Sequence, residues 1–154
     1  FFFLFLFVLF LFLSFSYNNY YIIQMKKITR KNIVKRLDTV FSLYIRLREA
    51  DNEMVECFTC GKISHYKKNM QCGHFQSRGA YSTRWDPTNC QVQCYGCNVM
   101  QQGRQYQFGL NLEKKYGEGV AEELLIKSKQ TVKYSNDDLQ ELILYYNNLL
   151  KQYL

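Results

Sequence analysis

The stretch NCQVQCYGCN, residues 89–98, contains the second of two Cys-x-x-Cys pairs, and these pairs decide the fold of this chain. The first pair is Cys57 and Cys60, in CFTCGK, and the second is Cys94 and Cys97. This is the spacing of a tetrahedral zinc site, in which four thiolates saturate the metal and leave no open position. We therefore predict a structural zinc ion at the base of a 33-residue loop.

Six cysteines would also suit a set of disulfides in a secreted protein. The paired spacing favours metal binding instead, and it indicates a reducing compartment in which zinc replaces a larger core. Cys72 and Cys90 lie outside the two pairs. We expect both to be buried thiols, with Cys72 as a further zinc ligand as the alternative.

Charge is distributed unevenly along the 154 residues, whose net charge is +7. Residues 26–104 contain 14 Lys or Arg and 6 Asp or Glu, whereas residues 105–154 contain 6 and 7. An excess of positive charge around the cysteines favours an anionic partner, either nucleic acid or an anionic membrane surface. The length favours one compact domain.

Residues 1–24 form an apolar, low-complexity segment that begins FFFLFLFVLFLFL. A signal peptide would need a basic start and a small-residue cleavage site, and the uninterrupted run is shorter than the ~20 residues of a spanning helix. Phe and Leu tracts are also what T-rich DNA encodes, and the first methionine is Met25. The prediction is an over-extended gene model, with a membrane anchor or a signal peptide as alternatives, and a domain over residues 25–154.

Residues 29–49 are predicted to form an amphipathic helix capped by Thr29. Its apolar stripe is Ile33, Leu37, Val40, Phe41, Tyr44 and Leu47. Between Lys26 and Arg48 there are eight basic residues and one acid. A solvated face is the ordinary interpretation of any one of these charges, but so little acid among them indicates phosphate contact. The candidate DNA-binding residues here are Lys31, Lys35, Arg46 and Arg48.

The remainder is predicted to form an α+β chain. Residues 55–93 are broken by glycine and proline, which favours knuckles, short strands and loops. Helices are expected over residues 98–116 and 119–129, and a last helix begins at the capping signal Ser135-Asn136-Asp137-Asp138. Its apolar stripe is expected to be packing surface: Leu139, Leu142, Ile143, Tyr146, Leu149 and Leu150.

The order of motifs, C-x-x-C, G-H and N-x4-C-x-x-C-N, resembles the HNH, or ββα-metal, nucleases that contain paired zinc knuckles. It is more similar still to the phage recombination proteins of the lambda NinG (Rap) type, over about residues 36–150. The similar segments are FSLYIRLREAD (41–51), CFTCGK (57–62), QCGHFQSRG (71–79), RWDPTNCQVQCYGCN (84–98) and KYSNDDLQELILYY (133–146). The resemblance implies a small zinc-stabilised ββα-metal core between an N-terminal basic helix and C-terminal helices.

The resemblance also implies a DNA endonuclease that cuts branched recombination intermediates, Holliday junctions and D-loops, with Mg²⁺ or Mn²⁺. His74 would be the general base, since a neutral imidazole suits that role. Asn98 would ligate the catalytic metal, and Asn89 would orient the hairpin loop or His74. Arg78 and Arg84 would contact phosphates near the cut.

The sequence departs from the family pattern where an acidic metal ligand is expected. Gly73 stands where many HNH enzymes have an acid, and Gln71 stands where NinG proteins often have Asp. Asp86 is a candidate replacement. His74 alone would also suit a packed hairpin histidine or a zinc ligand in place of one cysteine, and Asn98 would suit a helix cap.

The alternative function is therefore a non-catalytic, zinc-stabilised protein that binds branched DNA selectively. In either case the expected partner is branched, single-stranded or double-stranded DNA, and no membrane is expected. A homodimer is expected by analogy, because a four-way junction has two-fold symmetry. The expected location is the bacterial cytoplasm of a phage or prophage host.

Overall fold

The computed structural model describes residues 29–154, so the predictions for the apolar segment 1–24 lie outside the described residues. The elements, in order, are α2 (Arg30–Leu47), β1 (Met54–Glu56), β2 (Ile63–His65), β3 (Met70–His74), β4 (Cys90–Cys94), the π-helix η1 (Gly96–Met100), α3 (Gln105–Tyr116), α4 (Val120–Ser128) and α5 (Asn136–Leu150). The chain is thus α+β, as predicted. In the part described, no helix combines the length and hydropathy that crossing a bilayer requires.

Helix α2 starts after Thr29, whose hydroxyl accepts a hydrogen bond from the Asn32 N–H at 3.4 Å, so the predicted cap is confirmed. Its buried face consists of Ile33, Leu37, Phe41, Ile45 and Leu47. The prediction missed Ile45, which lies one turn beyond Phe41 on the same face. The predicted Val40 and Tyr44 are only partly buried against this core.

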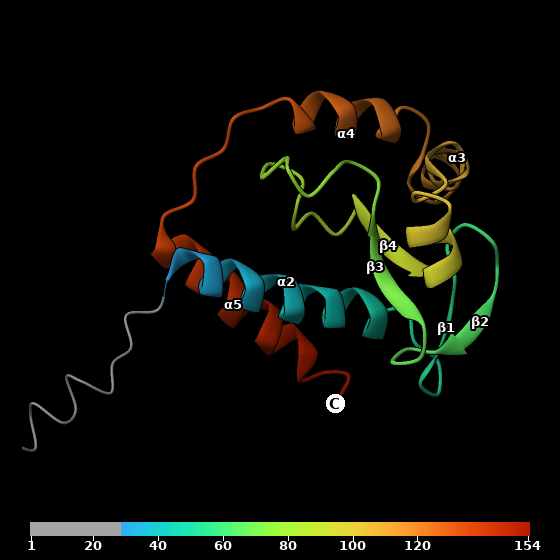
Figure 1. Cartoon of the computed structure of the whole chain (residues 1–154), viewed down its shortest axis with the longest axis horizontal. Coiled ribbons are helices and arrows are strands. Elements are labelled where there is room, and N and C mark those ends of the chain that lie inside the picture. Colours follow the sequence, from blue (N-terminus) through green and yellow to red (C-terminus); the bar gives the residue numbers. More distant parts are fainter. Residues whose placement is uncertain (1–28) are drawn as a thin grey trace, which may run out of the picture. The chain divides into compact units, whose positions relative to one another are not determined.

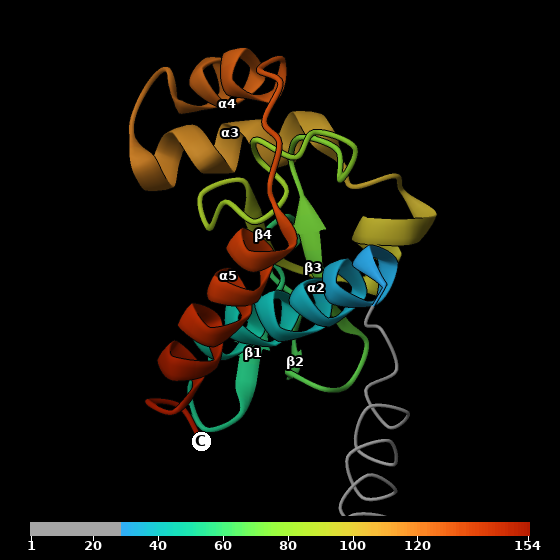
Figure 2. The ribbon, with the colours of Figure 1, turned by 90° about the vertical axis from the view of Figure 1, so that its left-hand side faces the viewer.

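Helix α5 lies beside α2, as Figure 1 and Figure 2 both show. It begins with the predicted capping box: Ser135 Oγ accepts from the Asp138 N–H, and Asp138 Oδ2 accepts from the Ser135 N–H. The predicted stripe packs inward, and its fully buried members are Leu139, Ile143, Tyr146 and Leu150. The rings of Phe41 and Tyr146 meet edge to face, with centroids 4.9 Å apart. These two helices and the strands share the main hydrophobic core.

The four strands form two separate antiparallel ribbons, β1 with β2 and β3 with β4. In the β3–β4 ribbon, Met70 lies opposite Cys94 and His74 lies opposite Cys90. Every residue of β4 is buried. The short strands predicted between residues 55 and 93 are therefore confirmed, and the ribbon places His74 where β3 enters the connecting loop, residues 75–89.

The single helix predicted over residues 98–116 is wrong, because the chain forms η1 and then breaks before α3. Gln102, Gly103 and Arg104 have φ of +49°, +83° and +46°, in the left-handed region that no helix continues through. Gln93 of β4 stabilises this break, because its Nε2 donates to the Gly103 carbonyl at 2.8 Å. Beyond it, α3 packs on α4 through a second, smaller core of Phe108, Leu112 and Leu124.

Candidate functional site

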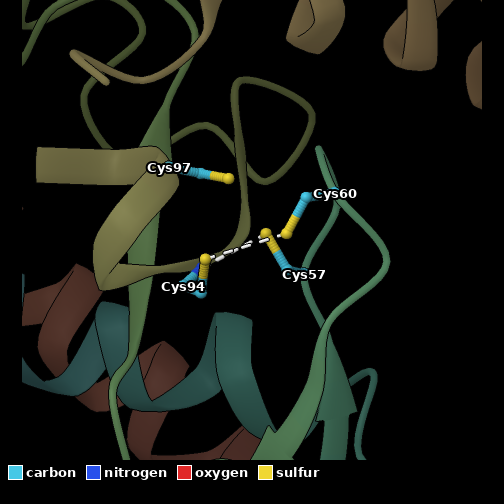
Figure 3. Close-up of side chains that lie close together, drawn as sticks. All are labelled: Cys57, Cys60, Cys94 and Cys97. Carbon is cyan, nitrogen blue, oxygen red and sulfur yellow. Dashed lines mark hydrogen bonds between the residues drawn. The ribbon is translucent and has the colours of Figure 1, made fainter. Parts of the chain in front are cut away.

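Four cysteine sulfurs converge where the segment after β1 meets the end of β4. Figure 3 shows Cys57 and Cys60 from the first segment facing Cys94 and Cys97 from β4 and η1. The four sulfur atoms all lie within 4.8 Å of one another. Zinc–sulfur bonds of about 2.3 Å place the sulfurs of a tetrahedral site at only slightly smaller separations. The donor set therefore fits a metal such as zinc, with no position left for a substrate.

The hydrogen bonds around Cys57 favour its thiolate form in this four-cysteine cluster. Burial by itself would raise the pKa of Cys57, but hydrogen bonds from the Thr59 side chain and the Cys94 N–H outweigh it and lower the pKa to about 6. The Cys94 N–H donates to Cys57 Sγ at 3.2 Å. Such backbone donors stabilise the charge that a metal-bound sulfur bears.

The position immediately before His74, Gly73, has no room for a side chain. A Cβ built at Gly73 would lie 2.1 Å from Gln93 Oε1, which crosses from the opposite strand. Gln93 is fully buried and its Nε2 is hydrogen-bonded to Thr59 and Gly103, so it cannot move aside cheaply. An acidic side chain therefore does not fit at this position.

His74 is held by one ring nitrogen at the end of β3. Its Nε2 lies 3.0 Å from the Arg84 carbonyl oxygen. A carbonyl only accepts, so this contact requires a proton on Nε2 and leaves the lone pair of the neutral ring on Nδ1. Burial, followed by the nearby positive charge of Arg78, lowers the pKa of His74 to about 4. The imidazole is therefore neutral, and able to accept a proton, at neutral pH.

His74 opens onto a cavity of about 730 Å³. The cavity is lined by Ser42, Arg46, Met70, Gln71, Cys72, His74, Arg78, Asn98, Val99, Gln102, Gly103 and Gln105. Two residues predicted to be catalytic, His74 and Asn98, thus share one cavity with two predicted DNA-binding residues, Arg46 and Arg78. Of the lining residues, Gln102 and Gln105 were missed, because only the break after η1 brings them to this place.

Asn98 lies inside η1 and is not a helix cap; Tyr95 is the N-cap residue and its side chain makes no capping bond. The Asn98 Nδ2 donates to Gln71 Oε1 at 2.6 Å. This hydrogen bond joins Asn98 to the position at which relatives were expected to have an acid. Neither residue is charged, so the pair offers amide oxygens only.

The cavity does not fit a tightly held Mg²⁺ ion. Protein sites for Mg²⁺ normally contain one or two carboxylates, whereas the lining residues include two arginines and no acid. The candidate replacement, Asp86, is used elsewhere: its Oδ1 accepts from the Thr88 N–H and its Oδ2 from Lys127. It lines a different hollow, next to α4.

Asn89 holds the loop between β3 and β4 together, as expected of a residue that orients this loop. It is fully buried. Its Oδ1 accepts from the Gln76 N–H at 2.7 Å, and its Nδ2 lies 3.0 Å from both the Gln76 and Thr83 carbonyls. The loop that presents Arg84 to His74 is thus fixed from inside, and Asn89 does not line the cavity.

The other predicted DNA-binding residues differ in their surroundings. Arg84 forms a two-pronged ion pair with Asp38, at 3.0 and 2.6 Å. Arg48 donates to the Pro87 and Cys90 carbonyls at 3.1 and 2.9 Å, and its side chain is only 10% exposed. These two guanidiniums are occupied within the fold, and Arg46 is partly so, because its Nε and Nη1 donate to the Ser42 and Tyr66 carbonyls at 3.1 and 2.9 Å. Arg78, Lys31 and Lys35 are exposed.

The chain matches a known protein family. A family model described as bacteriophage lambda NinG protein matches residues 20–153. No curated protein and no solved structure gives a match. The match spans most of the chain, and it includes both cysteine pairs, the β3–β4 ribbon and α5, which confirms the resemblance drawn from the motifs.

Proposed function

Because the chain belongs to the family of the bacteriophage lambda NinG protein, we propose that it is a DNA endonuclease of phage recombination. Its substrates would be branched intermediates, Holliday junctions and D-loops, in which it hydrolyses a phosphodiester bond. One observation supports this above the others: a neutral His74, with its Nε2 fixed by a backbone carbonyl, opens onto a cavity with two guanidiniums.

Hydrolysis of a phosphodiester requires a base for the attacking water and positive charge around the phosphate. His74 Nδ1 takes the proton from water. Arg78 and the remaining Nη2 group of Arg46 bind the nonbridging oxygens of the phosphate, because guanidinium N–H groups donate to such oxygens. The Arg46 Nε and Nη1 already donate to the Ser42 and Tyr66 carbonyls. Asn98 and Gln71 add amide groups on the wall of the cavity that lies on η1 and β3. We infer that β3, β4 and η1 are the counterpart of the ββα-metal unit of HNH nucleases.

Two metals enter the proposal with different support. Zinc at Cys57, Cys60, Cys94 and Cys97 is structural and rests on the converging sulfurs. Dependence of cleavage on Mg²⁺ or Mn²⁺, with Asn98 as a ligand, rests on the family resemblance alone, since the cavity lacks a carboxylate. A homodimer and a location in the cytoplasm of a phage-infected bacterium belong to the same proposal.

The same lack of a carboxylate favours a second candidate function. A chain that had lost its catalytic metal would still have zinc, basic residues and a fixed loop, and would bind branched DNA without cutting it. His74 discriminates between the two functions, because binding alone does not need a base.

The test incubates the full chain, loaded with one equivalent of zinc, with a labelled four-way junction in Mg²⁺, in Mn²⁺ and after EDTA. His74→Ala runs beside His65→Ala, the matched control, since His65 is the only other histidine and does not line the cavity. We expect cleavage by the wild type and by His65→Ala. We expect a loss of about 10²-fold or more in His74→Ala, with DNA binding unchanged.

Binding without cleavage in either metal would replace the nuclease proposal with the DNA-binding one. Equal cleavage by His74→Ala and the wild type would place the active site elsewhere. Cleavage that persists in EDTA would remove the divalent metal from the proposal and leave His74 with the two arginines.

A further inference from the structure

Three metal-binding side chains outside the four-cysteine cluster meet on one face of the β3–β4 ribbon. Cys72 and His74 are two residues apart on β3, and therefore point to the same side of the strand. Cys90 lies directly opposite His74 on β4. The sulfur of each cysteine and one ring nitrogen of His74 lie within 4.8 Å of one another.

We propose that Cys72, His74 and Cys90 form a second metal site, selective for a soft or borderline cation such as Zn²⁺. Thiolate and imidazole ligands are those that zinc prefers, and bonds of about 2.3 Å to sulfur and about 2.0–2.1 Å to nitrogen are compatible with donor atoms that lie within 4.8 Å of one another. Hard cations such as Mg²⁺ prefer oxygen and would not bind here.

The site would be open in a way that the four-cysteine cluster is not. Three protein ligands leave one tetrahedral position for water or another exchangeable ligand. Cys72 and His74 both line the 730 Å³ cavity, so solvent can reach that position. Cys90 is fully buried behind them.

The proton and charge balance of binding is simple. Each of the two thiols gives up its proton to solvent, neutral His74 donates a lone pair, and Zn²⁺ with two thiolates has no net charge. Zinc must displace the Cys90 proton against burial, which raises the pKa of Cys90 well above its usual value, whereas the positive charge of Arg48, which donates to the Cys90 carbonyl at 2.9 Å, opposes that rise. Arg46 lines the same cavity as Cys72 and contributes positive charge to its wall.

A metal bound here would have a consequence for cleavage, and this part rests on the proposed function. A metal bound to Nδ1 would occupy the lone pair that accepts the proton from water. A metal bound to Nε2 would displace the contact with the Arg84 carbonyl that orients the ring. Zinc in excess over the four-cysteine cluster would therefore inhibit the nuclease, and removing that zinc would restore it.

The test counts metal ions in the full chain and does not depend on cleavage. Zinc per chain is measured by mass spectrometry after equilibration with excess zinc and gel filtration, and Co²⁺ is used as a spectroscopic probe. We expect two equivalents in the wild type and one in Cys72→Ala/Cys90→Ala. Val92→Ala is the matched control, because Val92 is buried opposite Cys72 and has no donor atom; it should retain two.

One equivalent in the wild type, or two in the double variant, would overturn the second site. A double variant that fails to fold leaves X-ray absorption of the wild type as the deciding measurement. A four-cysteine and a Cys₂His–water site together give on average about three sulfur and about one nitrogen or oxygen ligand per zinc. Four sulfurs per zinc would exclude the proposal.

The inhibition is tested separately, by comparing each protein with its own rate at one zinc equivalent. We expect a second equivalent to reduce wild-type cleavage at least tenfold and to leave the double variant unaffected. Equal inhibition of both proteins would show that His74 is not blocked through this site. Absence of cleavage in every protein would overturn the proposed function while leaving the metal count valid.

Discussion

At the scale of single residues, the environment of His74 decides what it can do. An unperturbed histidine is half protonated near pH 6.5. Burial and Arg78 favour the neutral form of His74 and bring its pKa to about 4, although the Arg84 carbonyl opposes them. The ring therefore remains a proton acceptor under conditions in which an exposed histidine is already a cation.

This environment predicts the pH dependence of cleavage. If His74 is the base, kcat/KM should remain near its maximum as the pH falls from 8 to about 5 and should decline only towards the pKa of about 4. A decline centred near pH 6.5, with the far-UV circular dichroism unchanged, would contradict it. His65→Ala should have the same profile as the wild type.

The same shift affects stability, and its sign follows from proton binding. The unfolded chain takes up a proton on this histidine near pH 6.5, whereas the folded chain resists it until about pH 4. The contribution of His74 to stability is thus complete above pH 6.5 and is lost as the pH falls through this window. Circular dichroism must therefore accompany the kinetic profile.

At the scale of elements, the loop between β3 and β4 depends on one buried side chain. Asn89 pairs with both the N–H and the carbonyl of Gln76 and with the Thr83 carbonyl, which also accepts from the Asp86 N–H at 3.2 Å. Arg84 is then held by Asp38 of α2, whose carboxylate also accepts from Trp85 Nε1 at 2.9 Å. The loop is therefore an ordered part of the site, although it has no regular secondary structure.

Replacing Asn89 by Ala should cost about 2–4 kcal/mol of unfolding free energy, because the Gln76 N–H and carbonyl lose their partner and the Thr83 carbonyl loses one of its two donors. The measurement is urea denaturation followed by circular dichroism. Asn148→Ala is the control: Asn148 is exposed on α5, and its loss should change the free energy by less than about 0.5 kcal/mol. Equal costs for the two variants would mean that the loop is not held through Asn89.

At the scale of the molecule, the four-cysteine cluster joins two parts of the chain that are far apart in the sequence. Cys57 and Cys60 follow β1, whereas Cys94 and Cys97 lie at the end of the ribbon that presents His74. A metal bound by the four cysteines of Figure 3 would link η1, which contains Asn98, to the segment after β1. The strands are only three to five residues long, so the metal would add a restraint to the core packing and to the hydrogen bonds that join them, such as the one from the Phe58 N–H to the Val92 carbonyl at 2.8 Å.

Removing the metal should therefore destabilise the whole unit. We expect a strong chelator to lower the Tm of the wild type by more than about 10 °C, which corresponds to a loss of about 3 kcal/mol or more. Cys97→Ser should lower the Tm similarly and respond little to the chelator. Zinc, but not Mg²⁺, should restore the wild type, and an unchanged Tm after metal removal would contradict a structural role.

The sequence was enough to predict the features that are formed by residues close together along the chain. The Cys-x-x-Cys pairs fix the metal-binding donors, and the Ser135–Asp138 capping box fixes the start of α5, because each involves residues three positions apart. The apolar stripe of α2 was found in the same way, since helical period is local. The order of motifs was enough to indicate the NinG family, which the family match confirms.

Only the tertiary structure decided which of these residues meet. It set Arg46 and Arg78 beside His74 but turned Arg84 towards Asp38, 46 residues away. The helix expected over residues 98–116 is also interrupted by a tertiary contact. The residues after η1 have a left-handed backbone conformation, which is stabilised by a hydrogen bond from Gln93 of β4. Such contacts join residues far apart in the sequence, and they depend on how the elements pack, which no local pattern specifies.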